Sequence, residues 1–161
     1  MTSGGAAQQG FVARGGWWVV GQVACFVVLA TVYALTPRDD IHLAVRVIGW
    51  VFIGAGAWLA ADAVVRIRGH LTPYPAPLEG SPLLRIGAYG VVRHPIYGAL
   101  VLEVFGIGLA LGSTWTSVGA FGLGFFFAMK LQHEERFLCA TYPDYEDYQR
   151  RVPWRLIRGL W

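Results

Sequence analysis

The stretch RHPIYGALVLEVFGIGLALG, residues 93–112, joins a basic, proline-containing start to a long apolar run. Pro95 suits the first turn of a helix, because the N–H that proline lacks would have no partner within the helix there. Proline also biases the preceding residue away from helical geometry, which keeps His94 at the entrance of the helix. The stretch therefore predicts an apolar helix over 96–112 whose start carries Arg93 and His94.

Composition and three further apolar runs indicate a membrane protein. Hydrophobic residues make up 55% of the 161 residues and charged residues only 14%, whereas ordinary soluble domains have about 25% charged residues. A bilayer core of about 30 Å needs about 20 residues of helix, and backbone polar groups in lipid must be paired within that helix. The sequence therefore predicts an all-α polytopic membrane helical bundle with about four transmembrane helices and a C-terminal interfacial helical segment. The expected spans are residues 17–36, 43–65, 96–112 and 114–130.

The distribution of basic residues predicts the orientation of a single membrane domain over 1–161. If the N-terminus lies inside, eleven of the thirteen Lys and Arg residues fall on the cytoplasmic side, and only Arg38 and Arg46 fall on the other. This excess follows the positive-inside rule and predicts an integral membrane protein with both termini in the cytoplasm. The expected parts are a flexible N-terminal tail over 1–16, the first two spans over 17–66, a cytoplasmic loop over 67–95, a helical hairpin over 96–130, and a cytoplasmic or interfacial C-terminal segment over 131–161 in which aromatics alternate with arginines.

The sequence also argues against several functional classes. No basic tract with interleaved aromatics of the nucleic-acid-binding kind is present, so no nucleic-acid partner is expected. Cys25 and Cys139 lie far apart and show no metal-ligand spacing, so neither a disulfide framework nor a metal site is expected. Any chemistry is therefore expected on the bundle itself, at its polar segments.

Two polar segments, distant in sequence, are expected on the same side of the membrane. The loop over 66–95 contains five prolines and four glycines, which favour turns over a continuous helix. It ends at Arg93 and His94, where the helix dipole and free backbone N–H groups favour an anionic group such as a carboxylate. The second segment brings Glu134 and Glu135 to the end of the fourth apolar run. Together the two segments would satisfy a ligand that carries both signs of charge.

The order of these motifs resembles a known family. RHPIYG after a GAY turn, followed by a helical hairpin, EERFL and YEDYQRRVPW, is similar to the isoprenylcysteine carboxyl methyltransferase and phospholipid methyltransferase family of integral membrane proteins. The resemblance covers roughly residues 78–155. It implies methyl transfer from S-adenosylmethionine, bound in a cytoplasm-facing pocket. The acceptor would be a prenyl or other lipid-like small molecule that reaches the pocket at the cytoplasmic interface, among the membrane lipids.

The resemblance and the residues themselves assign candidate roles. Lys130 falls where similar carboxyl methyltransferases use an arginine near the substrate, although a lysine cannot form the bidentate fork of an arginine. Glu103 lies inside the third apolar run, where an ionisable group is costly, and is either a substrate-side group or a structural hydrogen-bond anchor. The candidate catalytic residues are Glu103, Lys130 and Arg93. The candidate cofactor-binding residues are Ser81, Leu84, Tyr89, His94, Pro95, Ile96, Tyr97, Glu134 and Glu135.

Two other interpretations stay open at this point. Membrane-bound sterol-type reductases share a similar RHPxY motif and C-terminal tyrosine pattern, so a nicotinamide-dependent membrane reductase is one alternative. The pair of Glu134 and Glu135 counts against it. A non-catalytic membrane scaffold is the other alternative, although a scaffold would have little use for a preorganised cytoplasmic pocket.

Overall fold

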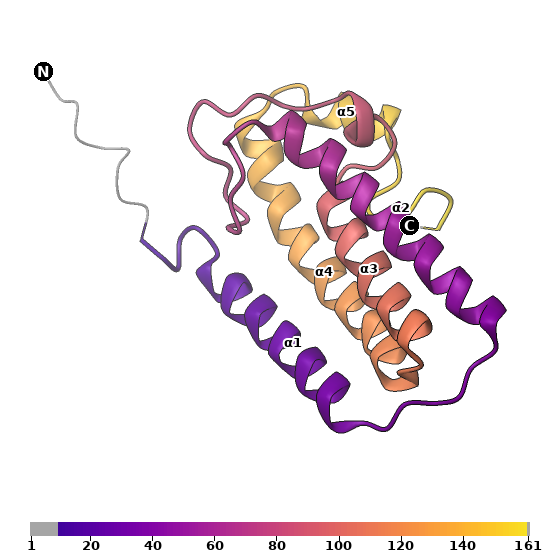
Figure 1. Cartoon of the computed structure of the whole chain (residues 1–161). Coiled ribbons are helices and arrows are strands. Elements are labelled where there is room, and N and C mark those ends of the chain that lie inside the picture. The colour runs from indigo at the N-terminus through magenta and orange to yellow at the C-terminus, as the bar shows by residue number, and fades with distance from the viewer. Residues whose placement is uncertain (1–9, 161) are drawn as a thin grey trace, which may run out of the picture.

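The computed structural model describes residues 10–160, which form five α-helices and one short 3₁₀ helix (Figure 1). No strand occurs within these described residues, so an all-α fold is confirmed for them. Most of the tail expected over 1–16 lies outside the described residues. The elements are α1 (Gly16–Leu35), α2 (Leu43–Ile67), η1 (Gly87–Gly90), α3 (Pro95–Leu111), α4 (Thr114–Thr141) and α5 (Tyr145–Arg151).

The four apolar runs become helices with nearly the expected limits, except at the end of α4. This helix continues to Thr141, eleven residues past the expected limit at 130. No glycine or proline interrupts residues 131–142, and Pro143 follows, so the backbone stays helical after the apolar run has ended. Glu134 and Glu135 therefore lie within α4 itself.

Two helices, α1 and α2, are long and apolar enough to cross a membrane. Little of either helix is buried inside the protein, and large apolar side chains point outward from the bundle, among them Trp50, Trp58 and Phe121. A surface of this kind fits lipid better than water. α3 has 17 residues, which is about 25 Å of helix. The crossing of the membrane by α3 and α4 stays a prediction.

α3 lies at the centre of the bundle, between α2 and α4, and α1 packs against α4 (Figure 1). α2 and α3 approach closely because glycines meet between them. A Cβ added at Gly49 would lie 2.4 Å from the backbone nitrogen of Ala110, and one added at Gly106 would lie 2.7 Å from the carbonyl oxygen of Gly49. Small residues permit such close helix contacts in membrane bundles.

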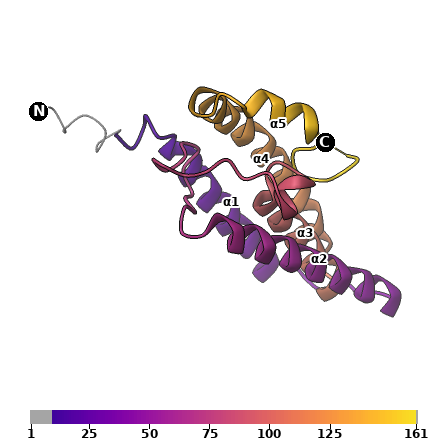
Figure 2. The same ribbon diagram turned by 90° about the horizontal axis from the view of Figure 1, so that it is seen from above.

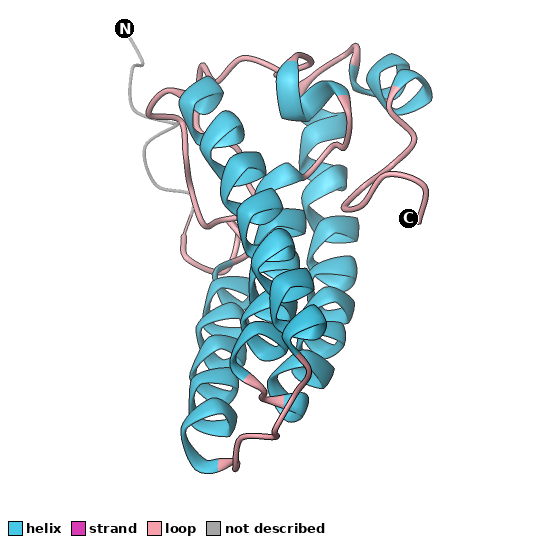
Figure 3. Cartoon of the chain, turned by 45° about the vertical axis from the view of Figure 1, so that its right-hand side comes forward, coloured by secondary structure: helices cyan, strands magenta, loops and turns pink. Residues whose placement is uncertain are grey.

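The polar segments gather at one end of the bundle. Because consecutive helices alternate in direction, the end of α2, the start of α3 and the end of α4 lie together with α5 (Figures 1 and 3). Viewed onto this end, the loop over 68–94 runs from α2 toward the start of α1 and returns to α3 (Figure 2). The two polar segments that are distant in sequence thus meet in space.

Beyond α5 the described chain is not helical. Residues 152–160 turn back toward the start of α3, where the backbone N–H of Arg93 donates to the Trp154 carbonyl (2.9 Å) and that of His94 donates to the Arg155 carbonyl (2.9 Å). The expected C-terminal helical segment is therefore helical only at the end of α4 and in α5. Residues 152–160 instead follow a non-helical path, which the backbone hydrogen bonds to Arg93 and His94 hold.

Candidate functional site

The turn η1 is fixed between α2 and α5. The Asp62 carboxylate of α2 accepts a hydrogen bond from the Ala88 N–H (2.6 Å) and two from the Arg66 guanidinium (2.8 Å each). From the other side, the Tyr148 hydroxyl of α5 donates to the Tyr89 carbonyl (2.7 Å). These bonds hold Tyr89 at a defined position at the polar end of the bundle.

Arg93, which is 7% exposed, is held by a carboxylate and by the C-terminal segment. Its Nε donates to Glu135 Oε1 (2.7 Å), and its Nη1 donates to the carbonyl oxygens of Val152 (2.7 Å) and Pro153 (2.9 Å). Glu135 Oε1 also lies 3.3 Å from His94 Nε2. Burial alone would raise the pKa of Glu135, but the hydrogen bonds and charges of His94 and Arg93 outweigh burial and lower this pKa to about 2. Glu135 is therefore a paired, buried anion.

The neighbouring Glu134 faces a different set of groups. Its Oε2 accepts a hydrogen bond from the Tyr97 hydroxyl (2.9 Å), and its Oε1 lies 3.6 Å from His94 Nδ1. His94 thus has one ring nitrogen toward each of the two carboxylates. Burial alone would lower the pKa of His94, but the hydrogen bonds and charges of Glu134 and Glu135 raise it above its ordinary value. This arrangement favours the imidazolium form.

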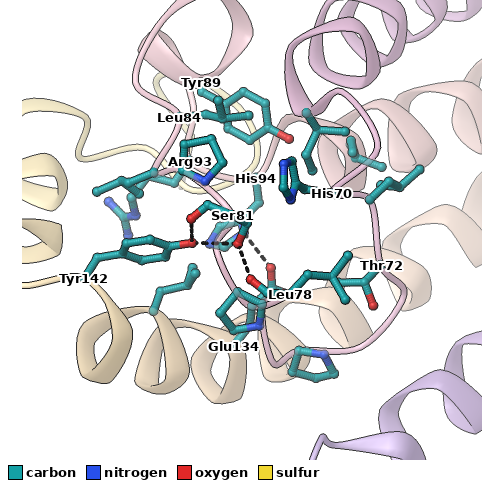
Figure 4. Close-up of a pocket in the computed structure, with 18 of the residues that line it drawn as sticks. His70, Thr72, Leu78, Ser81, Leu84, Tyr89, Arg93, His94, Glu134 and Tyr142 are labelled. Atoms are coloured by element: carbon teal, nitrogen blue, oxygen red, sulfur yellow. Dashed lines mark hydrogen bonds and ion pairs between the residues drawn. The ribbon is translucent and has the colours of Figure 1, made fainter. Parts of the chain in front are cut away.

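A cavity of about 160 Å³ opens beside these groups (Figure 4). Within the part of the chain that the structure describes, Glu134 is the only carboxylate in its lining. Burial, together with the charge of Glu134, raises the pKa of Tyr89 to about 12. The cavity is therefore aromatic, with Glu134 as its acidic group and with Arg93 and His94 as basic groups in the same lining, which suits a ligand that carries both signs of charge. The tyrosines that line it are Tyr74, Tyr89, Tyr97, Tyr142, Tyr145 and Tyr148.

The loop side of the cavity is tied to the end of α4. The Tyr142 hydroxyl donates to the Ser81 carbonyl (2.7 Å) and lies 2.8 Å from Ser81 Oγ, as Figure 4 shows. An exposed ion pair between Arg85 and Asp144 (3.1 Å) joins the same two segments. The loop is thus fastened across the cavity by contacts between residues distant in sequence.

The start of α3 offers different free N–H groups from those that the sequence suggests. The N–H groups of Arg93 and His94 donate to carbonyls of the C-terminal segment, and Pro95 has no N–H. Among residues 10–160, the N–H groups of Ile96 and Tyr97 have no acceptor, and both residues line the cavity. The free donors expected at His94 therefore lie instead in the first turn of the helix, at Ile96 and Tyr97.

Most of the expected site residues come together at this cavity. Glu135 does not line it and lies behind Arg93 and His94, whereas Arg93 itself is part of the lining. The roles of all these residues in binding or catalysis stay predictions. The expected cofactor-binding residues that line the cavity are Ser81, Leu84, Tyr89, His94, Pro95, Ile96, Tyr97 and Glu134.

Two expected catalytic residues lie outside the lining. Lys130 is buried, and its ammonium donates to Gln22 Oε1 (2.6 Å) and to the Pro73 carbonyl (3.0 Å). Glu103 is half-buried and faces α2, where the absence of a side chain at Gly56 makes room for it. Neither side chain is in the cavity wall, and their catalytic roles stay predictions.

Part of the cavity wall comes from residues outside the expected site. The C-terminal segment is expected to be cytoplasmic or interfacial, and its residues Tyr142, Tyr145 and Tyr148 line the cavity. Tyr145 and Tyr148 are both buried, and their spacing of three residues places two side chains on one helix face. That spacing is a signal that could have found them. The segment over 70–78, which carries no motif, supplies another part of the wall.

These features define a helical membrane protein with an aromatic cavity at the polar end of its bundle. Residues 44–145 match the sequence model of the phospholipid methyltransferase family, and the chain belongs to that family. The family expected from the RHPIYG and EERFL motifs is thereby confirmed. The matched region contains α2, η1, α3 and α4, and it leaves out α1.

Individual relatives match shorter parts of the chain. The cobalt-zinc-cadmium resistance protein CzcN of Cupriavidus metallidurans is 30% identical over 76 residues, which cover 47% of this chain and 35% of the relative. The nickel-cobalt-cadmium resistance protein NccN of Alcaligenes xylosoxydans is 26% identical over 76 residues, covering 47% and 36%. The protein-S-isoprenylcysteine O-methyltransferase of Schizosaccharomyces pombe is 28% identical over 106 residues, covering 63% and 45%. The matches thus span less than half the length of these curated relatives. No solved structure matches the chain.

Proposed function

We propose that this chain is an S-adenosylmethionine-dependent methyltransferase that acts on a lipophilic acceptor at the cytoplasmic membrane interface. Membership of the phospholipid methyltransferase family supports the reaction class. The observation that carries the proposal is the position of Glu134, the single carboxylate of an aromatic cavity at the polar end of an apolar bundle. Neither a reductase nor a scaffold accounts for the family match.

The residues around the cavity fit the charges of S-adenosylmethionine. Its methionine part carries an ammonium and a carboxylate, and its sulfur is positively charged. Glu134 would hold the ammonium, and the unpaired N–H groups of Ile96 and Tyr97 at the positive end of α3 would hold the carboxylate. The ring of Tyr89 offers an aromatic face for the sulfonium.

The protein's contribution to catalysis would be binding, alignment and exclusion of water. When bound, the cofactor supplies an activated methyl group for in-line displacement by the acceptor. Glu135 fixes Arg93 and His94, and these residues in turn fix the inner wall of the cavity. The loop that Tyr142 fastens at Ser81 covers the cavity. Positioning of the reactants and exclusion of water are the main sources of acceleration for such a reaction.

The surroundings of the cavity favour a lipid-like acceptor. Apolar side chains cover the outside of the helices below the cavity, and a prenyl or acyl chain can occupy the same hydrocarbon region. Eleven of the thirteen basic residues of the chain fall in segments expected on the side of the cavity. By the positive-inside rule this end is cytoplasmic, and both termini lie on the same side.

Binding and transfer assays test the proposal. Purified protein in detergent should bind S-adenosylhomocysteine by calorimetry, and Glu134→Gln should weaken binding about tenfold or more, because it removes a charge-assisted bond to the ammonium. Glu146→Gln is the matched control, since Glu146 is exposed on α5 and outside the cavity lining. Labelled methyl groups should appear in a fraction of the membrane lipids. Absence of both cofactor binding and methyl transfer in the wild-type protein would contradict the proposal.

A further inference from the structure

The only lysine of the chain is buried against three different elements. Lys130 of α4 is 0% exposed, and its ammonium donates to Gln22 Oε1 of α1 (2.6 Å) and to the Pro73 carbonyl of the loop (3.0 Å). The ammonium also lies 4.9 Å from the ring centroid of Tyr97 in α3. A buried ammonium is costly unless it is paired or hydrogen-bonded. These contacts therefore fix the relative positions of α1, α3, α4 and the loop.

The loop residues next to Pro73 form part of the cavity wall and also contact residues 11–15, which lie just before α1. Tyr74 and Pro75 line the cavity. On its other side, Tyr74 meets the ring of Phe11 at 6.3 Å between centroids and the guanidinium of Arg14 at 4.2 Å from its own centroid. Pro75 packs against the backbone at Gly15, where an added Cβ would lie 2.8 Å from Pro75 Cγ. Residues 11–15 thus pack against this part of the cavity wall.

Few polar contacts hold α1 to the rest of the bundle. Among the described residues, the bond from Lys130 to Gln22 is the only side-chain hydrogen bond that joins α1 to another helix. The remaining contact with α4 is apolar and aromatic packing, such as Gly21 against Phe126 and Trp18 against His133. α1 also lies outside the region that matches the family. Lys130 consequently connects a segment outside the family match with the wall of the cavity.

We propose that Lys130 is a positioning residue, which holds residues 73–75 and the start of α1 closed over the cavity. It does so by donating to Pro73 and Gln22, and it does not contact the methyl acceptor. This inference rests on the proposed function for its ligand, S-adenosylmethionine. The clamp consists of Lys130, Gln22 and the wall over 73–75, and its loss opens the cavity to water and speeds release of the cofactor.

Two substitutions separate the clamp from chemistry. Lys130→Met keeps an unbranched stem and removes every donor, whereas Gln22→Met keeps the lysine and removes its partner on α1. Each is expected to raise the Kd for S-adenosylhomocysteine and the KM for S-adenosylmethionine about tenfold, while kcat at saturating cofactor stays within about threefold of wild type. The double variant should add little to Lys130→Met alone, because that substitution already removes the bond to Gln22 together with the bond to Pro73. Gln132→Met is the control, since Gln132 is exposed on α4.

The single lysine also gives a readout that is independent of activity. Labelling with an amine-reactive reagent, followed by mass spectrometry, should modify Lys130 much more slowly in the folded protein than in the same protein unfolded in denaturant. Gln22→Met should speed up its modification, and Gln132→Met should not. If Gln22→Met speeds up the labelling of Lys130 but the wild-type protein binds no S-adenosylhomocysteine, the clamp is supported and the proposed cofactor is rejected.

Three results would overturn the inference. The first is labelling of Lys130 that is as fast in the folded wild-type protein as in the protein unfolded in denaturant. The second is a Gln22→Met variant with unchanged labelling and unchanged cofactor affinity. The third is a folded Lys130→Met variant that loses kcat while the Kd and KM for the cofactor stay at their wild-type values, because that pattern belongs to a residue in contact with the reacting groups.

Discussion

Replacing Glu135 by Gln removes the negative charge from the buried cluster around Arg93 and His94. The carboxylate faces three cationic groups, namely Arg93 Nε at 2.7 Å, His94 Nε2 at 3.3 Å and Arg155 Nε at 3.3 Å. A glutamine keeps one acceptor oxygen but leaves the buried guanidinium of Arg93 without its counter-charge. We therefore expect the substitution to destabilise the fold.

The size of this loss of stability follows both from the burial of the ion pair and from the lowered pKa of Glu135. Removal of one partner from a buried ion pair costs about 3–5 kcal/mol, because the other charge stays buried. The lowering of the Glu135 pKa from 4.5 to about 2 corresponds to about 3 kcal/mol of stability at neutral pH. Because glutamine retains an acceptor, we expect the free energy of unfolding to fall by about 3 kcal/mol, at the lower end of the first range.

Denaturant unfolding in detergent, followed by tryptophan fluorescence, measures this change. Glu146→Gln is the control, since this exposed residue should alter stability by less than about 0.5 kcal/mol. Glu134→Gln retains an acceptor for the Tyr97 hydroxyl but removes a charge 3.6 Å from His94 Nδ1, so it should destabilise the fold less than Glu135→Gln, which also leaves Arg93 unpaired, while it weakens cofactor binding. Equal free energies of unfolding for Glu135→Gln and Glu146→Gln would contradict the expected destabilisation.

Three further predictions concern pH, the acceptor and topology. Glu135 contributes stability that is full above pH 4.5 and is lost as the pH falls toward 2. His94, whose pKa is raised, contributes stability that is full below pH 6.5 and is lost as the pH rises through the raised value. Melting temperatures should therefore peak between these limits, and a profile without acid or alkaline loss would contradict the assignment. Glu103→Gln should lower methyl transfer per folded molecule at unchanged cofactor affinity if its carboxylate faces the acceptor, whereas full turnover with a lower melting temperature would make it a structural anchor. Reporter fusions should place both termini in the cytoplasm, and a reporter at the C-terminus that is active only outside would reject the orientation.

The long helices could be predicted because their causes are local. The length of each apolar run, the proline at the start of α3 and the left-handed Gly112 at its end, with φ of 69°, can all be recognised along the chain. The end of α4 could not be predicted from apolarity, because apolarity reports contact with lipid and not the persistence of the helix. The better signal is Pro143, the first helix-breaking residue after the run.

The path of the C-terminal segment could not be predicted because it depends on pairing between distant backbones. The carbonyls of Trp154 and Arg155 accept from the N–H groups of Arg93 and His94, and backbone carbonyls carry no sequence signature. This pairing removes two of the donors that the sequence suggests for an anionic ligand. It also means that Arg93 holds the C-terminal segment in place, because its side chain and its backbone both donate to that segment.

Glu134 and Glu135 are adjacent in the sequence, but the helical turn of α4 points their side chains in different directions. Consecutive residues of a helix point about 100° apart, so two adjacent carboxylates cannot face one cavity equally. Phe127 and Leu131 are fully buried between α4 and its neighbours, and Glu135 continues the same stripe at a spacing of four residues. A carboxylate on this stripe must be paired inside the protein, and Arg93 meets that need. Glu134 lies one step around the helix, at the edge of the stripe and in the cavity wall, so it is the acidic group that stays available to a bound cation.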